Sequence, residues 1–217
     1  RLHRWIRPPT MGSVSLKDLR TQVRLVWKPA SMAGLGILGL HSMAMVALWS
    51  MTPLYLIEER GLSSGMTGVL FSVMVLSGSL GAVLLGRLSD KRNRKIMTVA
   101  ILVVGATSPI LILLAPTLPV LIAALMLAGL IIMGLLPTLI ATVLSIVGGR
   151  QMVMIGLIMG TGEVVGALGA LLAGAAGETD LRLSLLVVSI IEISCAFLAS
   201  VHPFTPVMTD NTAAEAP

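Results

Sequence analysis

The stretch Gly86-Arg87-Leu88-Ser89-Asp90-Lys91-Arg92-Asn93-Arg94-Lys95 decides how the rest of the chain is organised. It is the only dense cluster of charges after residue 60, and long apolar runs flank it on both sides. Lys and Arg cross hydrocarbon at high cost and collect on the cytoplasmic side of membranes, so this pattern is typical of a short cytoplasmic loop between two spans. The cluster therefore orients the whole chain.

The composition indicates an integral membrane protein. Of the 217 residues 56% are hydrophobic and 12% are charged, whereas soluble domains carry about 25% charged residues. The apolar runs are continuous and about 20 residues long, which favours membrane-spanning helices over a β-barrel. The net charge of +5 comes from residues beside these runs, and aromatic residues make up 3%. This favours the lipid bilayer over nucleic acid as the basic residues' partner.

The chain divides into three predicted parts: a basic cytoplasmic segment over 1–28, a six-helix transmembrane domain over 29–201 and a short cytoplasmic tail over 202–217. The first part holds seven of the fifteen Lys and Arg residues. From Ser15 its apolar residues recur at helical spacing, which predicts an amphipathic helix on the membrane surface; a solvated basic linker is the alternative. Because residue 1 is Arg, we expect the chain to start inside a longer protein. The predicted spans are 30–57, 64–86, 96–115, 118–147, 152–177 and 182–201.

The distribution of basic residues supports one topology. With the cluster in the cytoplasm, thirteen of the fifteen Lys and Arg residues lie inside, and only Arg60 and Arg182 lie outside. This asymmetry predicts a multi-pass protein of the plasma or inner membrane, with both ends of this segment cytoplasmic.

An internal repeat divides the six spans into two sets of three. Leu80-Gly81-Ala82-Val83-Leu84-Leu85-Gly86 in the second span resembles Leu168-Gly169-Ala170-Leu171-Leu172-Ala173-Gly174 in the fifth. Because three is odd, the two sets must insert with opposite orientation, as in the inverted repeats of many secondary transporters. The predicted fold class is thus an all-α membrane protein made of two inverted three-helix repeats.

The charged loop also carries a family resemblance. Gly86-x-x-x-Asp90-Lys91-x-x-Arg94-Lys95 resembles the loop signature of the major facilitator superfamily, with Asn93 where the family usually has Gly. Asn tolerates a left-handed backbone, so the turn can be kept. The resemblance implies that Asp90 helps to hold the cytoplasmic side closed against a partner in another half. The alternative is that the basic residues of the loop only set topology.

Members of this family have two six-helix halves, and the chain looks like the second. The implied partner is an N-terminal six-helix half, absent here, or a second copy of the chain. The end of the first span, Leu54-Tyr55-Leu56-Ile57-Glu58-Glu59-Arg60-Gly61, further resembles fosmidomycin-resistance exporters.

Two acids lie in the middle of predicted spans, where a charge is costly unless it faces a cavity or a partner. Glu163 lies on a stripe of small residues that predicts close approach of a neighbouring helix. We expect Glu163 to be a protonatable coupling residue; the alternative is a neutral acid that locks helix packing. For Glu192, on a helix that the resemblance places at the periphery, packing is favoured. Gly162-x-x-x-Gly166-Ala167-Leu168-Gly169-Ala170 also resembles a Gly-rich antiporter motif, with Ala167 in place of Pro.

His41, Met45, Trp49 and Thr52 follow one another on nearly one face of the first span. By the resemblance this helix lines the central cavity, so the four residues are predicted to contact substrate, and His41 is a second proton-coupling candidate. Packing within the bundle is the alternative for each. Pro137 is expected to kink the fourth span beside Thr138, another cavity-lining candidate.

An enzymatic function is not favoured. Gly61-Leu62-Ser63-Ser64-Gly65 has the spacing of a serine-hydrolase nucleophile, but that motif needs a strand-to-helix turn and here it joins two membrane helices. The sequence has one cysteine, no metal-ligand spacing and no phosphate-binding loop, so neither a metal nor another cofactor is expected. We therefore expect proton-coupled export of small apolar or weakly charged compounds by alternating access. The alternatives are a non-transporting membrane fragment and a self-pairing six-helix protein.

Overall fold

The computed structural model describes residues 27, 29–91, 94–147 and 151–201, and within these ranges all regular structure is helical. The predicted surface helix and cytoplasmic tail lie outside them. The elements are α2 (Pro29–Glu58), α3 (Ser64–Lys91), α4 (Arg94–Leu114), α5 (Leu118–Ala128), η2 (Gly129–Met133), α6 (Gly134–Val147), α7 (Gln151–Gly177) and α8 (Leu181–Val201).

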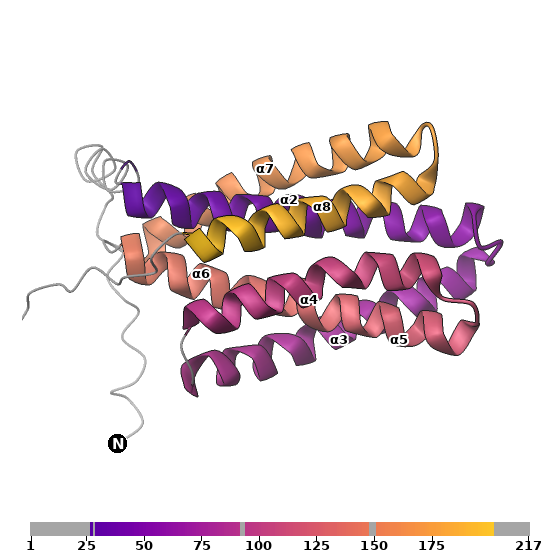
Figure 1. The fold of residues 1–217 in the computed structure, drawn as a ribbon, viewed down its shortest axis with the longest axis horizontal. Helices are drawn as coiled ribbons and strands as arrows, with labels where there is room; N and C mark the ends of the chain where they lie inside the picture. Colours follow the sequence, from indigo (N-terminus) through magenta and orange to yellow (C-terminus); the bar gives the residue numbers. More distant parts are fainter. Residues whose placement is uncertain (1–26, 28, 92–93, 148–150, 202–217) are drawn as a thin grey trace, which may run out of the picture.

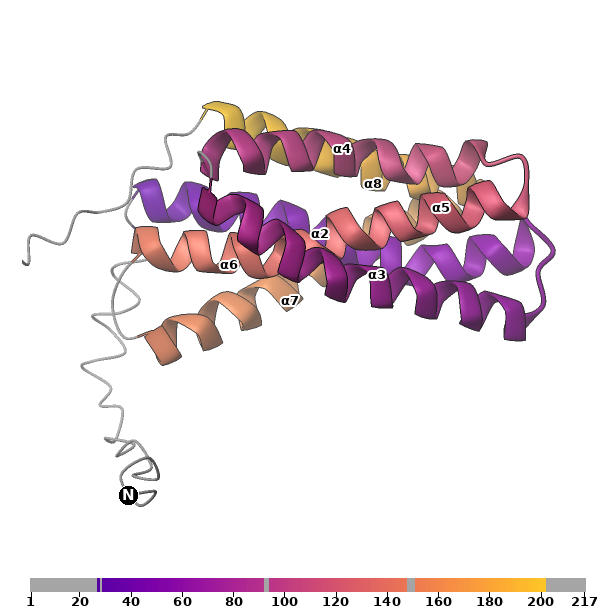
Figure 2. The same ribbon diagram turned by 90° about the horizontal axis from the view of Figure 1, so that it is seen from below.

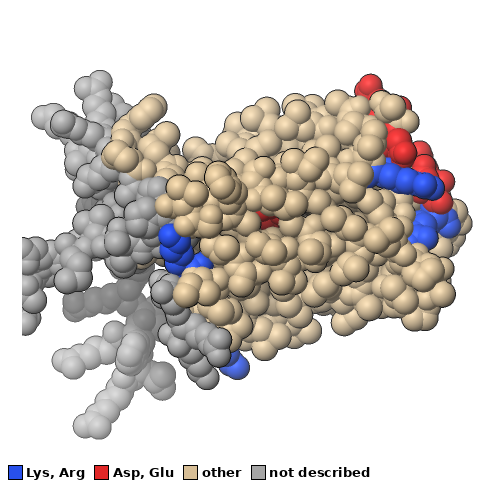
Figure 3. Space-filling view, in the orientation of Figure 1, with Lys and Arg blue, Asp and Glu red and all other residues tan. Residues whose placement is uncertain are grey.

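These elements form six spans, as predicted, because α5, η2 and α6 follow one another as one span. All six are long and apolar enough to cross a membrane. In the space-filling view charged side chains gather at the two ends of the bundle, and the surface between them is almost free of charge (Figure 3). This is the pattern that a bilayer imposes on a helical bundle.

The helices pack as two interlocked sets (Figures 1 and 2). The first span of each set packs against the second span of the other: α2 lies along α7, and α3 lies along α5, η2 and α6. The third spans, α4 and α8, pack against each other. Because α2 and the α5–α6 span run in opposite directions, the two sets are inverted with respect to each other (Figure 1).

Glycines show that the two sets use the same packing. A Cβ at Gly81 in α3 would collide with the backbone carbonyl of Leu130, and a Cβ at Gly169 in α7 would collide with that of Met43. One turn earlier, Gly78 lies against Met133 and Gly166 lies against Val46. Membrane helices associate through close packing of small residues. The repeat in the sequence is therefore also a repeat of helix contacts.

The predicted kink of the fourth span takes the form of a π-helix. The irregularity covers Gly129–Met133 and ends four residues before Pro137, which itself lies within α6. Proline cannot donate a hydrogen bond to the carbonyl four residues earlier, and its ring crowds that carbonyl. The disturbance therefore lies on the N-terminal side of Pro137, at Met133 and before it, rather than at the proline. π-helical turns within α-helices are frequent at functional sites.

The end of the bundle opposite the charged loop is held by Arg60. Its guanidinium donates hydrogen bonds to the carbonyls of Ile112 and Ala115, where α4 ends, and lies 5.8 Å from the centre of the Tyr55 ring. Carbonyls at a helix C-terminus lack intrahelical partners and attract positive charge. Arg60 thereby ties the end of α2 to the end of α4.

The segment with serine-hydrolase spacing, Gly61 to Gly65, forms the turn before α3 and the start of that helix. Gly61 adopts a left-handed conformation with φ 64°, and the backbone N–H of Met66 donates to the Ser63 hydroxyl at 3.3 Å. Ser63 is thus an N-cap of α3. The Gly and Ser of this motif serve a turn and a helix start.

Candidate functional site

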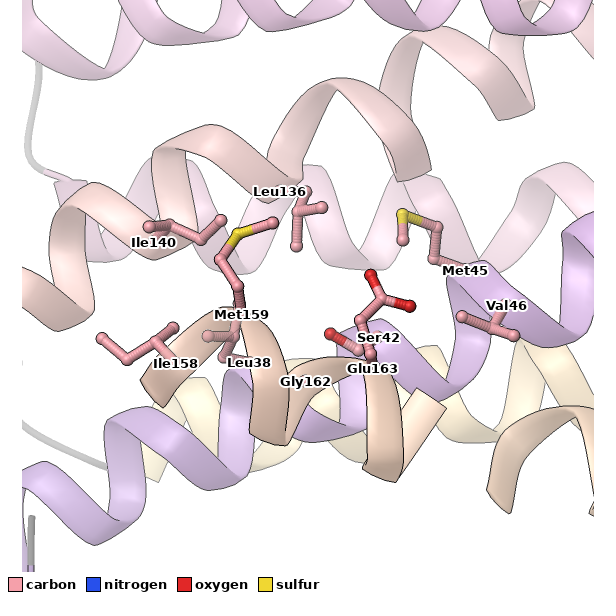
Figure 4. Close-up of a pocket in the computed structure, with 10 residues that line it drawn as sticks. All are labelled: Leu38, Ser42, Met45, Val46, Leu136, Ile140, Ile158, Met159, Gly162 and Glu163. Carbon is pink, nitrogen blue, oxygen red and sulfur yellow. The ribbon is translucent and has the colours of Figure 1, made fainter. Parts of the chain in front are cut away.

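A narrow pocket opens between α2, α6 and α7, and among the residues that the structure describes Glu163 is its only ionisable lining residue (Figure 4). Its carboxylate is directed into the pocket from α7. The one other polar side chain of the lining is the hydroxyl of Ser42 on α2. The remaining lining residues are Leu38, Met45, Val46, Leu136, Ile140, Ile158, Met159 and Gly162. A single carboxylate therefore faces an otherwise apolar space.

The small-residue stripe of Glu163 comprises Gly156, Gly160, Glu163, Ala167, Ala170 and Gly174, and its part from Gly156 to Ala167 has no close packing partner among the described residues. Glu163 and Ala167 are exposed, and a Cβ at Gly156 or Gly160 would have no atom within 4 Å. The expected close approach is made instead by a second glycine row of α7, which begins at Gly162 and faces α2. The α7 sequence carries both rows, and spacing alone could not tell which one is packed.

His41 and Glu192 form a buried pair in the middle of the bundle. Nδ1 of His41 on α2 lies 2.9 Å from Oε1 of Glu192 on α8, and the two side chains are 0% and 1% exposed. The other ring nitrogen, Nε2, lies 2.8 Å from the carbonyl oxygen of Ile132 in η2. Beside them Cys195 donates to the carbonyl of Ile37 at 3.2 Å. Three elements thus meet at one imidazole.

This position does not support the cavity-lining role predicted for His41, and it gives the packing expected for Glu192 a specific partner. The four residues predicted to share one face of α2 are in fact spread over it. Relative to His41, Thr52 lies about 20° around the helix, Met45 about 40° and Trp49 about 80°.

Exposure rises in the same order. His41 and Thr52 are fully buried, Met45 lines the Glu163 pocket, and Trp49 is 44% exposed with its ring centre 6.2 Å from that of Phe71. Thr138 on α6 is buried and does not line that pocket. A difference of about 80° around α2 therefore separates a buried position, His41, from an exposed one, Trp49.

The charged loop is described only in part. α3 runs through Lys91 and α4 begins at Arg94, so the turn itself, at 92–93, lies outside the described residues, as do the side chains of Asp90, Lys91 and Arg94. Gly86 has open space where a Cβ would stand, and Lys95 is partly buried. The gate role of this motif remains a prediction.

Comparison with known families agrees with the six apolar spans. The family model described as Major Facilitator Superfamily matches residues 34–216. The chain belongs to the major facilitator superfamily. It is therefore a multi-pass membrane protein of a transporter family, and its six spans correspond to half of the family's fold. No curated protein matches the sequence, and the finer resemblance to fosmidomycin-resistance exporters finds no support in the family match.

The pairing of His41 with Glu192 could not be predicted from the sequence. Both residues are ionisable groups in the middle of apolar spans, and such groups require partners or a cavity. The two lie on the first and last helices of the bundle, 151 positions apart. The packing of α8 on α2, which sequence spacing does not report, brings them together.

Proposed function

We propose that this major facilitator protein exports small apolar or weakly charged compounds in exchange for protons, with Glu163 as the coupling carboxylate. The observation that carries the proposal is the position of Glu163, the only ionisable residue that lines a pocket between α2, α6 and α7 in the described part of the chain. An ionised carboxylate in an apolar space is costly, so binding a proton there changes the energy of the site strongly.

The surroundings of the pocket favour apolar substrates. A groove of about 270 Å³ lies between α2 and α7 and shares Leu38, Ile158 and Gly162 with the Glu163 pocket. Its only polar side chain is Thr161, whose hydroxyl donates back to the carbonyl of Leu157 at 2.8 Å. This lining offers no free donor to a sugar or an organic anion. An apolar compound can therefore bind beside Glu163 and compete with its proton.

Alternating access requires a second unit to close the other side of the site. We propose that a second six-helix unit covers the exposed face of α7, either as the N-terminal half of a longer chain or as a second copy. The stripe that contains Gly156, Gly160, Glu163 and Ala167 supports this, because small residues allow close approach of membrane helices. Glu163 would then face both the pocket and the boundary between the two units.

The test is proton-driven transport by the full-length protein encoded by its gene, in everted membrane vesicles. Ethidium serves as a lipophilic cationic probe and chloramphenicol as an uncharged one. We expect wild-type protein to accumulate at least one probe when the vesicle interior is acidified, and we expect Glu163→Gln to abolish this accumulation.

The matched control is Glu178→Gln, which removes an exposed carboxylate directly after the last residue of α7. This variant should leave transport intact. Full transport by Glu163→Gln would refute the coupling role. If the wild type shows no proton-driven flux of either probe, the protein does not export these classes of compound, and the alternative of a non-transporting membrane protein is favoured.

A further inference from the structure

We propose that His41 and Glu192 form a second proton-binding site, separate from Glu163, that holds one proton between Nδ1 and Oε1 inside the closed bundle. Nε2 of His41 lies 2.8 Å from the carbonyl oxygen of Ile132. A carbonyl oxygen only accepts hydrogen bonds, so Nε2 must carry a hydrogen. The π-helix therefore fixes which tautomer a neutral His41 adopts.

The hydrogen on Nε2 determines what the other ring nitrogen can do. In the neutral ring Nδ1 is an acceptor, and it lies 2.9 Å from Oε1 of Glu192. One hydrogen must lie between these two atoms, because an ionised carboxylate facing the lone pair of Nδ1 would place two acceptors in contact. The pair therefore binds one exchangeable proton and has no net charge.

The second carboxyl oxygen indicates where this proton lies. Oε2 of Glu192 is buried and has no hydrogen-bond partner among the residues that the structure describes, and the only polar contact of Oε1 and of Nδ1 there is the 2.9 Å one that they make with each other. An ionised carboxylate would leave part of its charge unsolvated there, whereas a neutral acid would not. The resting pair is thus a neutral carboxylic acid that donates to a neutral imidazole.

The surroundings leave no other charge to replace this proton. Within the described ranges, the other ionisable side chains on the elements packed against the pair are few, and the charged ones lie toward the helix ends or in the separate pocket. They are Cys195 beside the pair, Tyr55 and Glu58 toward the end of α2, Arg87 in the last turns of α3, Lys95 at the start of α4, Glu163 on α7 and Arg182 at the start of α8. Loss of the proton would therefore leave a negative charge in the core between α2 and α8, and would favour separation of these helices.

The site differs from Glu163 in its access. Glu163 is exposed on the surface of α7, whereas both members of the pair are at most 1% exposed. The pair can exchange its proton only when α2, α8 and η2 move apart. A proton bound here thus reports and stabilises the packed state of the bundle, whether or not Glu163 couples transport.

Infrared difference spectroscopy of the full-length protein in lipid tests the protonation state. We expect a carboxylic acid C=O band from Glu192 in the wild type at neutral pH. The band should vanish in Glu192→Gln, which keeps the shape and a donor toward Nδ1 but has no removable proton. It should remain in Glu163→Gln, so a failure of the Glu163 proposal leaves this one testable.

Nitrogen NMR of ¹⁵N-histidine-labelled protein provides a measurement that needs no change at Glu192. With every other histidine of the protein replaced by Asn, His3 and His202 among them, His41 is the only labelled ring. We expect a neutral imidazole with hydrogen on Nε2 under the same conditions. A doubly protonated His41, hydrogen on Nδ1 instead of Nε2, or a carboxylate band lost on acidification in the wild type but not in Glu192→Gln, would overturn the proposal.

Discussion

Gly81 in α3 and Gly169 in α7 occupy equivalent places in the two three-helix sets, each against a backbone carbonyl of the first span of the other set. The carbonyls belong to Leu130 and Met43. This equivalence extends the short sequence repeat into the packing of the bundle. It also explains why glycine stands at these two points of the second spans, α3 and α7, because any side chain there would separate the helices.

Substitution of these glycines tests the repeat. Gly81→Ala and Gly169→Ala should each lower the free energy of unfolding by about 1–3 kcal/mol, because the new methyl group meets backbone rather than a flexible side chain. Gly68→Ala, in α3 but with open space around its Cβ, is the control and should change stability by less than about 0.5 kcal/mol. Equal stability of Gly81→Ala and Gly68→Ala in reversible unfolding in lipid would contradict the equivalence.

Most of the fold could be predicted from the sequence because a bilayer allows few alternatives. The six apolar runs fixed the spans, and the match between Leu80–Gly86 and Leu168–Gly174 indicated the repeat. The π-helix could not be predicted, because Pro137 indicates that the helix is disturbed but not which backbone geometry the preceding turn adopts.

The site was predictable only in part. Glu163 could be singled out as an acid in an apolar span, but α7 has two glycine rows and spacing does not say which is packed. His41 and Met45 differ by only about 40° around α2, yet one is buried against α8 and the other lines the pocket. The contacts of each helix decide such differences, and a single sequence contains no direct record of them.

The pairing of His41 and Glu192 makes a prediction about stability. Glu192→Ala leaves Nδ1 of His41 buried without a partner and should cost about 1–3 kcal/mol of unfolding free energy. Glu192→Gln keeps a donor at this place and should cost clearly less. Thermal unfolding of the two variants in one detergent gives the comparison; a Gln variant as unstable as the Ala variant would show that donation to Nδ1 is not what holds the pair.

Arg60 is expected to matter more than Arg182, although both are arginines at the same end of the bundle. Arg60→Ala removes two hydrogen bonds to the carbonyls of Ile112 and Ala115 and should cost about 1.5–3 kcal/mol. Arg182 is 64% exposed and its contact with Glu59 is 3.3 Å long, so Arg182→Ala should cost at most about 1 kcal/mol. If Arg60→Ala and Arg182→Ala lose equal stability in chemical unfolding, the hydrogen bonds of Arg60 to the end of α4 do not stabilise the bundle as described.

Ser63 is expected to act as a helix cap and not as a nucleophile. Ser63→Ala should lower stability by about 0.5–2 kcal/mol, because the N–H of Met66 loses its acceptor. Transport of the ethidium probe should continue in this variant. A serine-directed fluorophosphonate should label neither the wild type nor Ser63→Ala; labelling of the wild type that disappears in the variant would indicate a reactive serine.

The central claim is that Glu163 exchanges a proton for substrate, and proton release on substrate binding tests it most directly. Ethidium or chloramphenicol is added to the purified full-length protein in weakly buffered detergent solution, and the change in pH is recorded. We predict that the probe which the wild type transports releases protons from it, that Glu163→Gln binds this probe without release, and that Glu178→Gln behaves as the wild type. Equal proton release by the wild type and Glu163→Gln would contradict the account.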